Sequence, residues 1–184
     1  MNIIGITGTL GAGKGTIVEY LCKNYGYKHY SVRNFLINII NSKGEVPDRD
    51  SFVKTANDLR EQYGPAYIIQ QLYKQALQSK TNCIIESIRT LGEINSLKQQ
   101  DDFTLFAIDA DIELRYSRIV VRASETDKIS LETFIENENR EMHSDDPNKQ
   151  NLAACMNLAD YTFKNNSSLD ELYKQVDLAM KEIN

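Results

Sequence analysis

The chain has 184 residues, of which 41% are hydrophobic and 26% are charged, and its formal net charge is −5. This size and balance suit one soluble globular domain, and the acidic total disfavours a broad nucleic-acid-binding surface. No positively charged leader precedes an apolar stretch and no apolar run approaches the length of a membrane span, so we expect a cytoplasmic protein with no membrane or nucleic-acid partner.

Five short β-rich segments alternate with helical patterns along the chain. Strands are predicted at Ile3–Thr7, Tyr27–Ser31, Asn82–Glu86, Phe103–Asp109 and Tyr161–Lys164. Helices are predicted at about Lys14–Asn24, Val32–Asn41, Asp50–Gln62, Pro65–Gln78, Leu91–Gln99, Ile112–Arg122, Ser130–Met142, Gln150–Asn157 and Ser168–Ile183. The alternation predicts an α/β fold with a five-stranded parallel sheet flanked by helices, whose ligands bind beyond the carboxyl ends of the strands.

The first strand runs into a glycine-rich segment, Gly8-Thr9-Leu10-Gly11-Ala12-Gly13-Lys14-Gly15-Thr16, which is typical of a phosphate-binding loop (P-loop). The glycines let the backbone curl so that successive N–H groups point at phosphate oxygens, Lys14 adds a cation, and the following helix adds its positive end. Ile17, Tyr20 and Leu21 continue at helical spacing, so strand, loop and helix follow in the required order. The sequence therefore predicts a three-layer P-loop NTPase fold. The predicted nucleotide-binding residues are Gly8, Gly11, Ala12, Gly13, Lys14, Gly15 and Thr16.

One detail of this loop resembles adenylate kinase and the other nucleoside monophosphate kinases. Gly15 follows Lys14, and the hydroxyl residue Thr16 comes one position later than in most P-loop ATPases and GTPases. Because glycine cannot supply the direct hydroxyl ligand, the resemblance implies that Mg²⁺ is held mainly by phosphates, waters and a carboxylate elsewhere.

The second strand ends in Ser31-Val32-Arg33-Asn34-Phe35-Leu36, which is similar to the Ser-Thr-Gly-Asp-Leu-Leu-Arg segment of the same family. The resemblance implies that Ser31 belongs to the acceptor site and that residues 32–79, approximately, form an acceptor-binding insertion. Ile37 stands where the family has its arginine, so Arg33 either reaches the acceptor phosphate from another direction or lies on the surface.

A further arginine, Arg60, lies in this insertion within the segment Asn57–Pro65. Acceptor binding is one interpretation, and an exposed helix face of charged residues at i,i+3 and i,i+4 spacing is the other. Gly64 and Pro65 predict the end of one helix and the start of the next.

The third strand ends in Glu86-Ser87-Ile88-Arg89-Thr90, which places a carboxylate and an arginine at the edge of the presumed cleft. The turn is similar to the Asp, Gly, apolar pair, Arg, Thr turn of adenylate kinases, although it is one residue shorter and has Glu for Asp. The resemblance implies that Glu86 orients waters on Mg²⁺ and that Arg89 holds the acceptor phosphate. The alternative is that these two side chains pair with each other or cap a helix.

A predicted helix, Ile112–Arg122, carries three arginines at helical spacing. Its segment Arg118-Ile119-Val120-Val121-Arg122 matches the adenylate kinase pattern Arg-Ile-Val-x-Arg. The match implies that Arg118 lies against the adenine ring and that Arg122 neutralises phosphate charge when a lid closes. A solvated basic face is the alternative, and Arg115 fits that alternative better.

The next segment, about residues 123–151, is polar and acidic and is the candidate lid. Closing segments of this kind exclude water and complete a cation clamp around the phosphates. Arg140 and Lys149 could supply positive charge, but the sequence does not fix their direction.

The end of the chain, from Ala159 to Leu172, is similar to the Ala-Asp-x-x-Ile-x-Asn-x-Gly-Ser-Leu-x-x-Leu segment of dephospho-coenzyme A kinase, with Ser167 in place of the glycine. We expect a strand, an asparagine-rich turn and a helix capped by Ser167 or Ser168. The resemblance places the turn near the donor adenine and so implies a contact from Asn165 or from backbone groups beside it. Capping alone explains the pattern about as well.

Together these motifs predict a phosphotransferase that uses ATP and Mg²⁺, acts on a small-molecule nucleotide, and is a monomer or a homodimer. The favoured acceptor is a nucleoside or deoxynucleoside monophosphate, with Lys14, Arg89, Arg118 and Arg122 as the catalytic cations. A dephospho-coenzyme A kinase is the alternative that the tail favours. A further alternative is an ATP-binding regulatory module with little kinase activity, because the acceptor segment is altered.

The cysteines and histidines predict no metal centre. Cys22, Cys83 and Cys155 are far apart in apolar or helical settings, which favours buried free thiols with packing roles. His29 and His143 lack the spacing of paired metal ligands, so we expect surface or structural roles for them.

Overall fold

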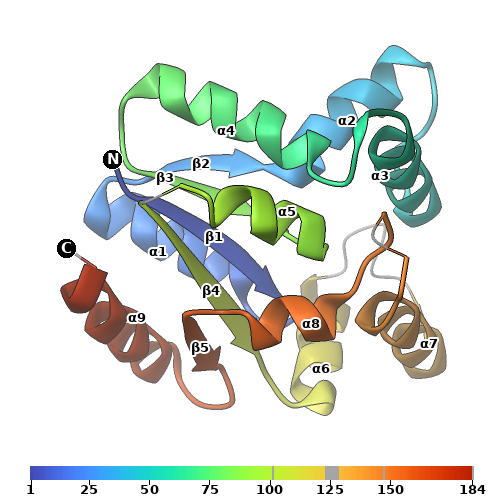
Figure 1. Cartoon of the computed structure of the whole chain (residues 1–184). Coiled ribbons are helices and arrows are strands. Elements are labelled where there is room, and N and C mark those ends of the chain that lie inside the picture. The colour runs from blue at the N-terminus through green and yellow to red at the C-terminus, as the bar shows by residue number, and fades with distance from the viewer. Residues whose placement is uncertain (101, 123–128, 147, 184) are drawn as a thin grey trace.

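A computed structural model describes residues 1–100, 102–122, 129–146 and 148–183, and its centre is a parallel β-sheet (Figure 1). The strands are β1 Ile3–Gly8, β2 Lys28–Ser31, β3 Cys83–Glu86, β4 Phe103–Asp109 and β5 Tyr161–Lys164. They lie in the order β2-β3-β1-β4-β5, and every neighbouring pair is parallel. The predicted five-stranded parallel sheet is confirmed.

The helices follow the prediction, and their ends differ from it by at most two residues. They are α1 Lys14–Tyr25, α2 Val32–Ser42, α3 Arg49–Tyr63, α4 Tyr67–Ser79, α5 Leu91–Leu97, α6 Ile112–Arg122, α7 Leu131–Met142, α8 Leu152–Asn157 and α9 Leu169–Ile183. Gly64 ends α3 with a φ of 100°, as expected, but α4 begins two residues after Pro65, with Ala66 at its N-cap. Shifts of this size are ordinary at helix ends, where capping and fraying compete.

Two apolar clusters, one on each face of the sheet, hold the three layers together. Because side chains alternate along a strand, neighbouring residues enter opposite clusters. Ile4, Ile84 and Phe106 pack with residues of α1 and α9, whereas Ile3, Ile85 and Leu105 pack with residues of α2, α3, α4, α5 and α8 (Figure 1). Each fully buried isoleucine contributes roughly 2 kcal/mol through the area that it removes from water. The predicted three-layer arrangement is confirmed.

The cysteines have the packing roles that the sequence predicts. All are free thiols, of which Cys83 and Cys155 are buried within the cluster that contains Ile3, and Cys22 packs against the cluster that contains Ile4. Burial raises the pKa of Cys83 and of Cys155 to about 12, so both thiols stay protonated. Among the helices that the structure describes, none is long and apolar enough to cross a membrane.

The strand order brings the chemically rich strand ends together. β1 lies between β3 and β4, so the loop after β1 has the end of β3 at Glu86 on one side and the end of β4 at Asp109 on the other. Parallel sheets bind ligands in the crevice beyond such carboxyl ends.

Candidate active site

The P-loop, residues 8–16, leaves β1 and enters α1 through backbone conformations that only glycine adopts without strain. Gly8 has a φ of 135° and Gly13 a φ of 107°. A Cβ atom on Gly8 would lie 2.0 Å from the carbonyl oxygen of Ile108, and one on Gly13 would lie 2.4 Å from the side-chain nitrogen of Asn165. The curled loop exposes the start of α1, whose first N–H groups have no partner within the helix. This is the geometry of an anion site.

Lys14 folds back over the loop. Its Nζ donates hydrogen bonds to the carbonyl oxygens of Gly8 and Thr9, both at 2.8 Å. Burial lowers the pKa of Lys14 to about 8, and the positive charge of Arg89 adds to this effect. A phosphate group in the loop would give this buried ammonium its counter-charge.

A cavity of about 710 Å³ opens beside the loop, between the P-loop, α2, α3, the end of β3, α6 and α7. Gly11, Gly13, Gly15 and Thr16 line it, whereas Gly8 and the fully buried Ala12 are not among the lining residues. In a chain of net charge −5, the lining gathers seven basic side chains against three carboxylates. They are Lys14, Arg33, Arg49, Arg60, Arg89, Arg118 and Arg122, against Glu19, Glu86 and Glu141.

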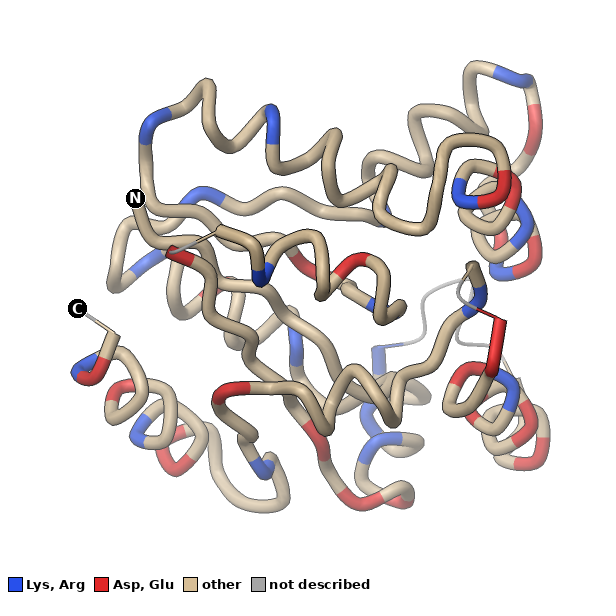
Figure 2. The backbone as a smooth tube through the Cα atoms, viewed as in Figure 1, with Lys and Arg blue, Asp and Glu red and all other residues tan. Residues whose placement is uncertain are grey.

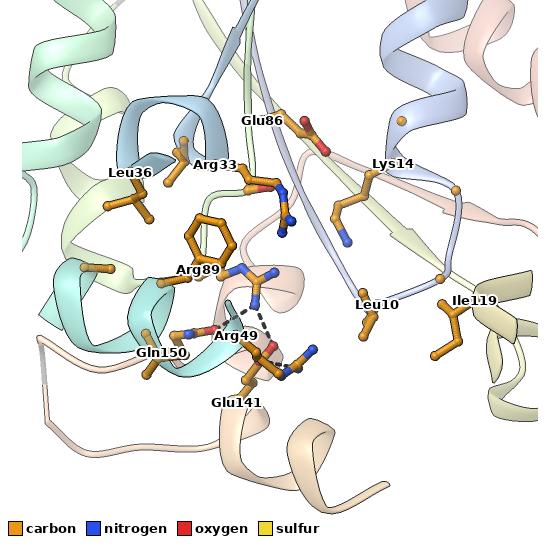
Figure 3. A pocket seen from close by; sticks show the side chains of 18 of the residues that line it. Leu10, Lys14, Arg33, Leu36, Arg49, Glu86, Arg89, Ile119, Glu141 and Gln150 are labelled. Atoms are coloured by element: carbon orange, nitrogen blue, oxygen red, sulfur yellow. Dashed lines mark hydrogen bonds and ion pairs between the residues drawn. The ribbon is translucent and has the colours of Figure 1, made fainter. Parts of the chain in front are cut away.

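This concentration of positive charge differs from the rest of the molecule. Acidic and basic positions mix along most elements, whereas α6 carries a run of basic positions (Figure 2). The side chains of Lys14, Arg33 and Arg89 converge on the middle of the cavity (Figure 3). Such a lining favours an anionic ligand.

Glu86 stands at the end of β3 on the cavity wall and accepts a hydrogen bond from His29 Nε2 at its Oε2 atom, at 3.1 Å. Burial acts to raise the pKa of Glu86, but the His29 hydrogen bond and the charges of Lys14 and Arg89 outweigh it and hold the pKa below its ordinary value. Ser87, which replaces the glycine of the similar turn, adopts a φ of 73°. The turn therefore keeps a backbone conformation that favours glycine.

Arg89 contacts a different carboxylate from the one that the pairing alternative named. Its Nη1 donates to Glu141 Oε2 at 2.5 Å and to Gln150 Oε1 at 2.8 Å, and Arg49 Nη2 donates to Glu141 Oε1 at 2.6 Å (Figure 3). Burial acts to raise the pKa of Glu141, but Arg89 and Arg49 outweigh it and keep this carboxyl ionised. Neither Arg49 nor Glu141 was predicted from the sequence.

Arg60 also lines the cavity, but its guanidinium is only 2% exposed, so the interpretation of an exposed charged helix face is wrong. Its Nη2 and Nε donate to Glu93 Oε1 at 2.8 and 3.3 Å. The other oxygen, Glu93 Oε2, accepts from the backbone N–H groups of Arg89 and Thr90 at 2.9 and 3.1 Å. Arg60 and Glu93 therefore fix the turn that carries Arg89.

The predicted acceptor residues of the second strand have different positions. Ser31 Oγ accepts a hydrogen bond from the Asn34 N–H at 3.2 Å and caps α2, and Ser31 is not among the residues that line the cavity. The structure thus gives Ser31 a capping role, because an N-cap hydroxyl satisfies an orphan helix donor. Arg33 is exposed, as the surface interpretation expects, and it also lines the cavity, with its guanidinium 4.4 Å from the ring centre of Phe52.

Two of the arginines of α6 line the cavity, as the adenylate kinase pattern implies. They are Arg118 and Arg122. Arg118 Nη2 donates to the carbonyl oxygen of Asn165 at 2.8 Å, whereas its buried Nη1 has no hydrogen-bond partner in the part of the chain that the structure describes. An unsatisfied buried donor beside the P-loop is suited to a nucleotide.

The third arginine of α6, Arg115, is only 5% exposed, so its expected place on a solvated face is wrong. It donates to the carbonyl oxygens of Ala110 at 2.7 Å and Leu10 at 3.3 Å, and it forms an ion pair with Glu138 of α7. The carbonyl of Leu10 turns this side chain inward, beneath the P-loop. Arg115 therefore ties the P-loop to α7.

Asn165 does not face the cavity, in contrast to the predicted contact with the base. Its side-chain nitrogen donates to the Ala12 carbonyl oxygen at 2.7 Å, and the residue is buried. Ser168, rather than Ser167, caps α9 by accepting from the Glu171 N–H at 3.3 Å. The turn after β5 therefore supports the P-loop from behind.

The two candidate lid cations lie outside the cavity. Arg140 is 52% exposed and lies 3.8 Å from Asp50, and Lys149 lies 3.7 Å from Asp146. The following residue in each case, Glu141 and Gln150, does line the cavity. Of the predicted lid, residues 123–128 and 147 are outside the described part of the chain.

The residues present fit a nucleotide with Mg²⁺. The loop and Lys14 form an anion site, and Glu86 is a carboxylate on the wall beside it. Within the described ranges no group of three or more His, Cys, Asp or Glu residues could hold a metal ion by itself. A divalent ion here would therefore depend on phosphate oxygens and water, as Mg²⁺ often does.

Comparison with known proteins agrees with this geometry. A family model described as "AAA domain" matches residues 4–144. The chain is 30% identical to a UPF0200 protein of Methanococcus vannielii, covering 100% of this chain and 97% of that protein. It is 29% identical to the UPF0200 protein MJ1399 of Methanocaldococcus jannaschii, covering 100% of this chain and 91% of that protein.

Solved structures share the fold at low sequence identity. The crystal structure of TT1252 from Thermus thermophilus has a TM-score of 0.67 at 18% identity and covers 100% of this chain and 98% of that one. A gluconokinase from Sinorhizobium meliloti has a TM-score of 0.61 at 11% identity, with 99% and 93% covered. A shikimate kinase from Aquifex aeolicus has a TM-score of 0.53 at 16% identity, with 98% and 96% covered. These likenesses confirm a kinase-like P-loop fold.

Proposed function

Because the chain belongs to the AAA domain family and to the UPF0200 proteins, and has the fold of P-loop kinases, we propose that it is an ATP- and Mg²⁺-dependent phosphotransferase. The proposed acceptor is a nucleoside or deoxynucleoside monophosphate. One observation carries the proposal: Lys14 of the P-loop and Arg89 of the β3 turn line the same cavity, close enough for the charge of Arg89 to lower the pKa of Lys14. A donor and an acceptor would meet between them.

Phosphoryl transfer needs positioning and charge stabilisation more than covalent help from the protein. On the donor side, the loop amides and Lys14 would bind the phosphates, and Arg118 and Arg122 would add positive charge from α6. Bound Mg²⁺ would neutralise charge on the phosphate oxygens, and Glu86 would hold it through water. Arg115 positions the loop by holding the Leu10 carbonyl.

On the acceptor side, the arginine-rich wall favours a phosphate ester. A monophosphate oxygen is already ionised, so no general base is required for it to attack. Glu86 then serves the metal, and its lowered pKa keeps it anionic for that role.

A hydroxyl acceptor is the second candidate, and Glu86 is the observation that favours it. A carboxylate on the cavity wall could accept a hydroxyl proton. The tail that resembles dephospho-coenzyme A kinase gives this candidate little support, because Asn165 holds the P-loop and Asp160 accepts from the Leu105 N–H at 2.7 Å. Both contacts are structural.

A coupled ADP-release assay tests the proposal. Mg²⁺–ATP is offered with ribo- and deoxyribonucleoside monophosphates, with dephospho-coenzyme A, and without an acceptor. ADP release that depends on one monophosphate supports the proposal. ADP release that depends only on dephospho-coenzyme A favours the second candidate, a hydroxyl acceptor. Acceptor-independent release, or none, contradicts both and favours the ATP-binding regulatory module.

A further inference from the structure

One carboxylate of α7 stands between two arginines from distant parts of the chain. Glu141 gives one oxygen to each guanidinium, Oε1 to Arg49 at 2.6 Å and Oε2 to Arg89 at 2.5 Å (Figure 3). The carboxylate is buried and ionised at the cavity wall. A ligand phosphate or carboxylate makes the same charge-assisted contacts to arginine.

Arg49 occupies a place where a cation does not stabilise its own helix. It is the first residue of α3, after the N-cap Asp48. The positive end of the helix dipole disfavours a cation there. The side chain instead reaches the cavity, where its buried Nε has no hydrogen-bond partner among the described residues. Glu141 therefore satisfies Arg49 only in part.

The same helix brings a second unsatisfied donor to the cavity. Arg60 is 2% exposed, and its Nη1 has no hydrogen-bond partner within the ranges that the structure describes, although Glu93 holds its Nη2 and Nε. Buried donors are normally paired, so an unpaired one on a cavity wall indicates a missing acceptor. Arg49 and Arg60 together offer more donors than the protein fills, which suits a ligand with several oxygen atoms.

We propose that Arg49 and Arg89 form the binding site for an anionic group of the acceptor, and that Glu141 fills this site until the acceptor displaces it. The acceptor is then a small molecule with a phosphate or a carboxylate group, and a neutral molecule is not recognised. This inference rests on the proposed function, because it names the group that the acceptor side holds. Arg49 becomes a specificity-determining residue.

Displacement of Glu141 would free one of two carboxylates by which α7 pairs with arginines, whereas the exposed Arg140 of α7 would stay near Asp50 of α3. Glu138, one turn earlier on α7, pairs with Arg115, which holds the Leu10 carbonyl of the P-loop. Glu141 holds the acceptor arginines. Acceptor binding would thus break one of two carboxylate attachments of α7 and keep the other.

The test measures anion binding directly, with the P-loop occupied. The protein is saturated with Mg²⁺ and a non-hydrolysable ATP analogue, and inorganic phosphate is titrated at constant ionic strength while the thermal midpoint is followed to obtain a Kd. Acetate replaces phosphate in a parallel titration, which separates a phosphate-binding from a carboxylate-binding site. ATP-analogue affinity and the circular dichroism spectrum confirm that each variant is folded.

Two variants and two matched controls decide the result. Arg49→Gln should weaken phosphate binding roughly tenfold because it removes one charge-assisted hydrogen bond, and Glu141→Gln should strengthen binding roughly tenfold because it neutralises the competing carboxylate. Arg140→Gln and Glu136→Gln change the same charges at exposed positions of α7 and should leave the Kd within about twofold. If Arg49→Gln does not fold, Arg49→Lys should weaken phosphate binding to an intermediate extent, because lysine keeps the positive charge but lacks the planar guanidinium that binds an anion with two hydrogen bonds.

Unchanged phosphate binding in both Arg49→Gln and Glu141→Gln overturns the inference, and so does weaker binding in Glu141→Gln, which would make Glu141 a positioning residue. This measurement needs no phosphoryl transfer. The proposed function and the inference about the anion site can therefore be contradicted independently. A protein that binds phosphate as expected but transfers nothing contradicts the proposed function alone. If the protein transfers the phosphoryl group but the wild type and Arg49→Gln have the same Kd for inorganic phosphate, this inference alone is contradicted.

Discussion

The two sides of the cavity are built in different ways. The centre of the donor side is one contiguous segment, Gly8–Thr16, to which α6 adds Arg118 and Arg122, and the shape of this segment depends on backbone conformations such as the φ of 107° at Gly13. The acceptor side is assembled from side chains of the turn after β3, of α3 and of α7, which meet at Glu141. A backbone-built site is local and rigid, whereas a charge-built site depends on which partner each arginine has. On the proposed function, a change in the acceptor arginines would leave the P-loop intact.

The donor side should be the more sensitive of the two to mutation. Lys14→Met should reduce phosphoryl transfer by about a thousandfold or more, because stabilising phosphate charge is the main catalytic contribution. The measurement is turnover with saturating acceptor. Lys23→Met, at an exposed position of the same helix, is the matched control. Substantial activity in Lys14→Met would show that the P-loop is not the donor site.

Removal of the acceptor arginine should have a smaller and more selective effect. Arg89→Ala should lower kcat/KM for the acceptor by about a hundredfold, because the acceptor anion no longer has this guanidinium as a partner, while ATP affinity changes little. Steady-state kinetics with each substrate varied separately measures both effects. An equal decrease in kcat/KM for ATP and for the acceptor would contradict the assignment of Arg89 to the acceptor side. Arg140→Ala is the control for an arginine that does not line the cavity.

The backbone origin of the donor side predicts a stability difference between two neighbouring glycines. Gly13→Ala should destabilise the fold by about 1–3 kcal/mol, because alanine is strained at this φ and its Cβ would meet Asn165. At Gly15 an added Cβ meets nothing within 4 Å, so Gly15→Ala should change stability far less. Urea unfolding of both variants measures the difference. Equal decreases in stability would contradict a backbone-built loop.

The smallest expected effect is the uptake of a proton by Lys14 when ATP binds. Lys14 has a pKa of about 8 because burial and Arg89 disfavour its charge, and bound phosphate should raise this pKa again. ATP binding at pH 8 should therefore take up about half a proton, and affinity should fall as pH rises through this range. Relative to the unfolded chain the lowered pKa costs stability below pH 8, and the cost disappears as pH rises towards 10.5.

Calorimetry of ATP binding in two buffers with different ionisation enthalpies measures this uptake. Lys14→Met serves as the control, since it should abolish the uptake. Proton release on binding, or uptake that survives in Lys14→Met, would assign the titration to another group.

The sequence allowed the fold and the P-loop to be predicted because both depend on local patterns. Short β-rich segments that alternate with helical patterns indicate the strands, and the glycines of Gly8–Thr16 indicate the backbone conformation of the loop. Arg115 was misplaced because helical spacing groups residues on a face without saying which face is buried. Its burial depends on the Leu10 carbonyl and on Glu138, which are distant in sequence.

The acceptor side was harder to predict for the same reason. Arg140 and Lys149 were considered because they are cations in the predicted lid, whereas the lining residues are their neighbours Glu141 and Gln150. In α7, one residue of helical rotation decides between Arg140 and Glu141, and in the loop before α8 the local backbone decides between Lys149 and Gln150; the sequence fixes neither. Arg49 did carry a signal, a cation directly after the helix cap Asp48, where the helix dipole disfavours it.

Tracing the phosphoryl group itself decides whether the protein is a kinase. The protein is given ATP labelled in the γ-phosphate with the acceptor that the panel identifies, and the label is followed in single-turnover experiments for the wild type and for Lys14→Met. We expect the wild type to move the label to the acceptor and the variant to leave it on ATP. Label released only as inorganic phosphate, or retained on ATP by the wild type, would contradict a kinase.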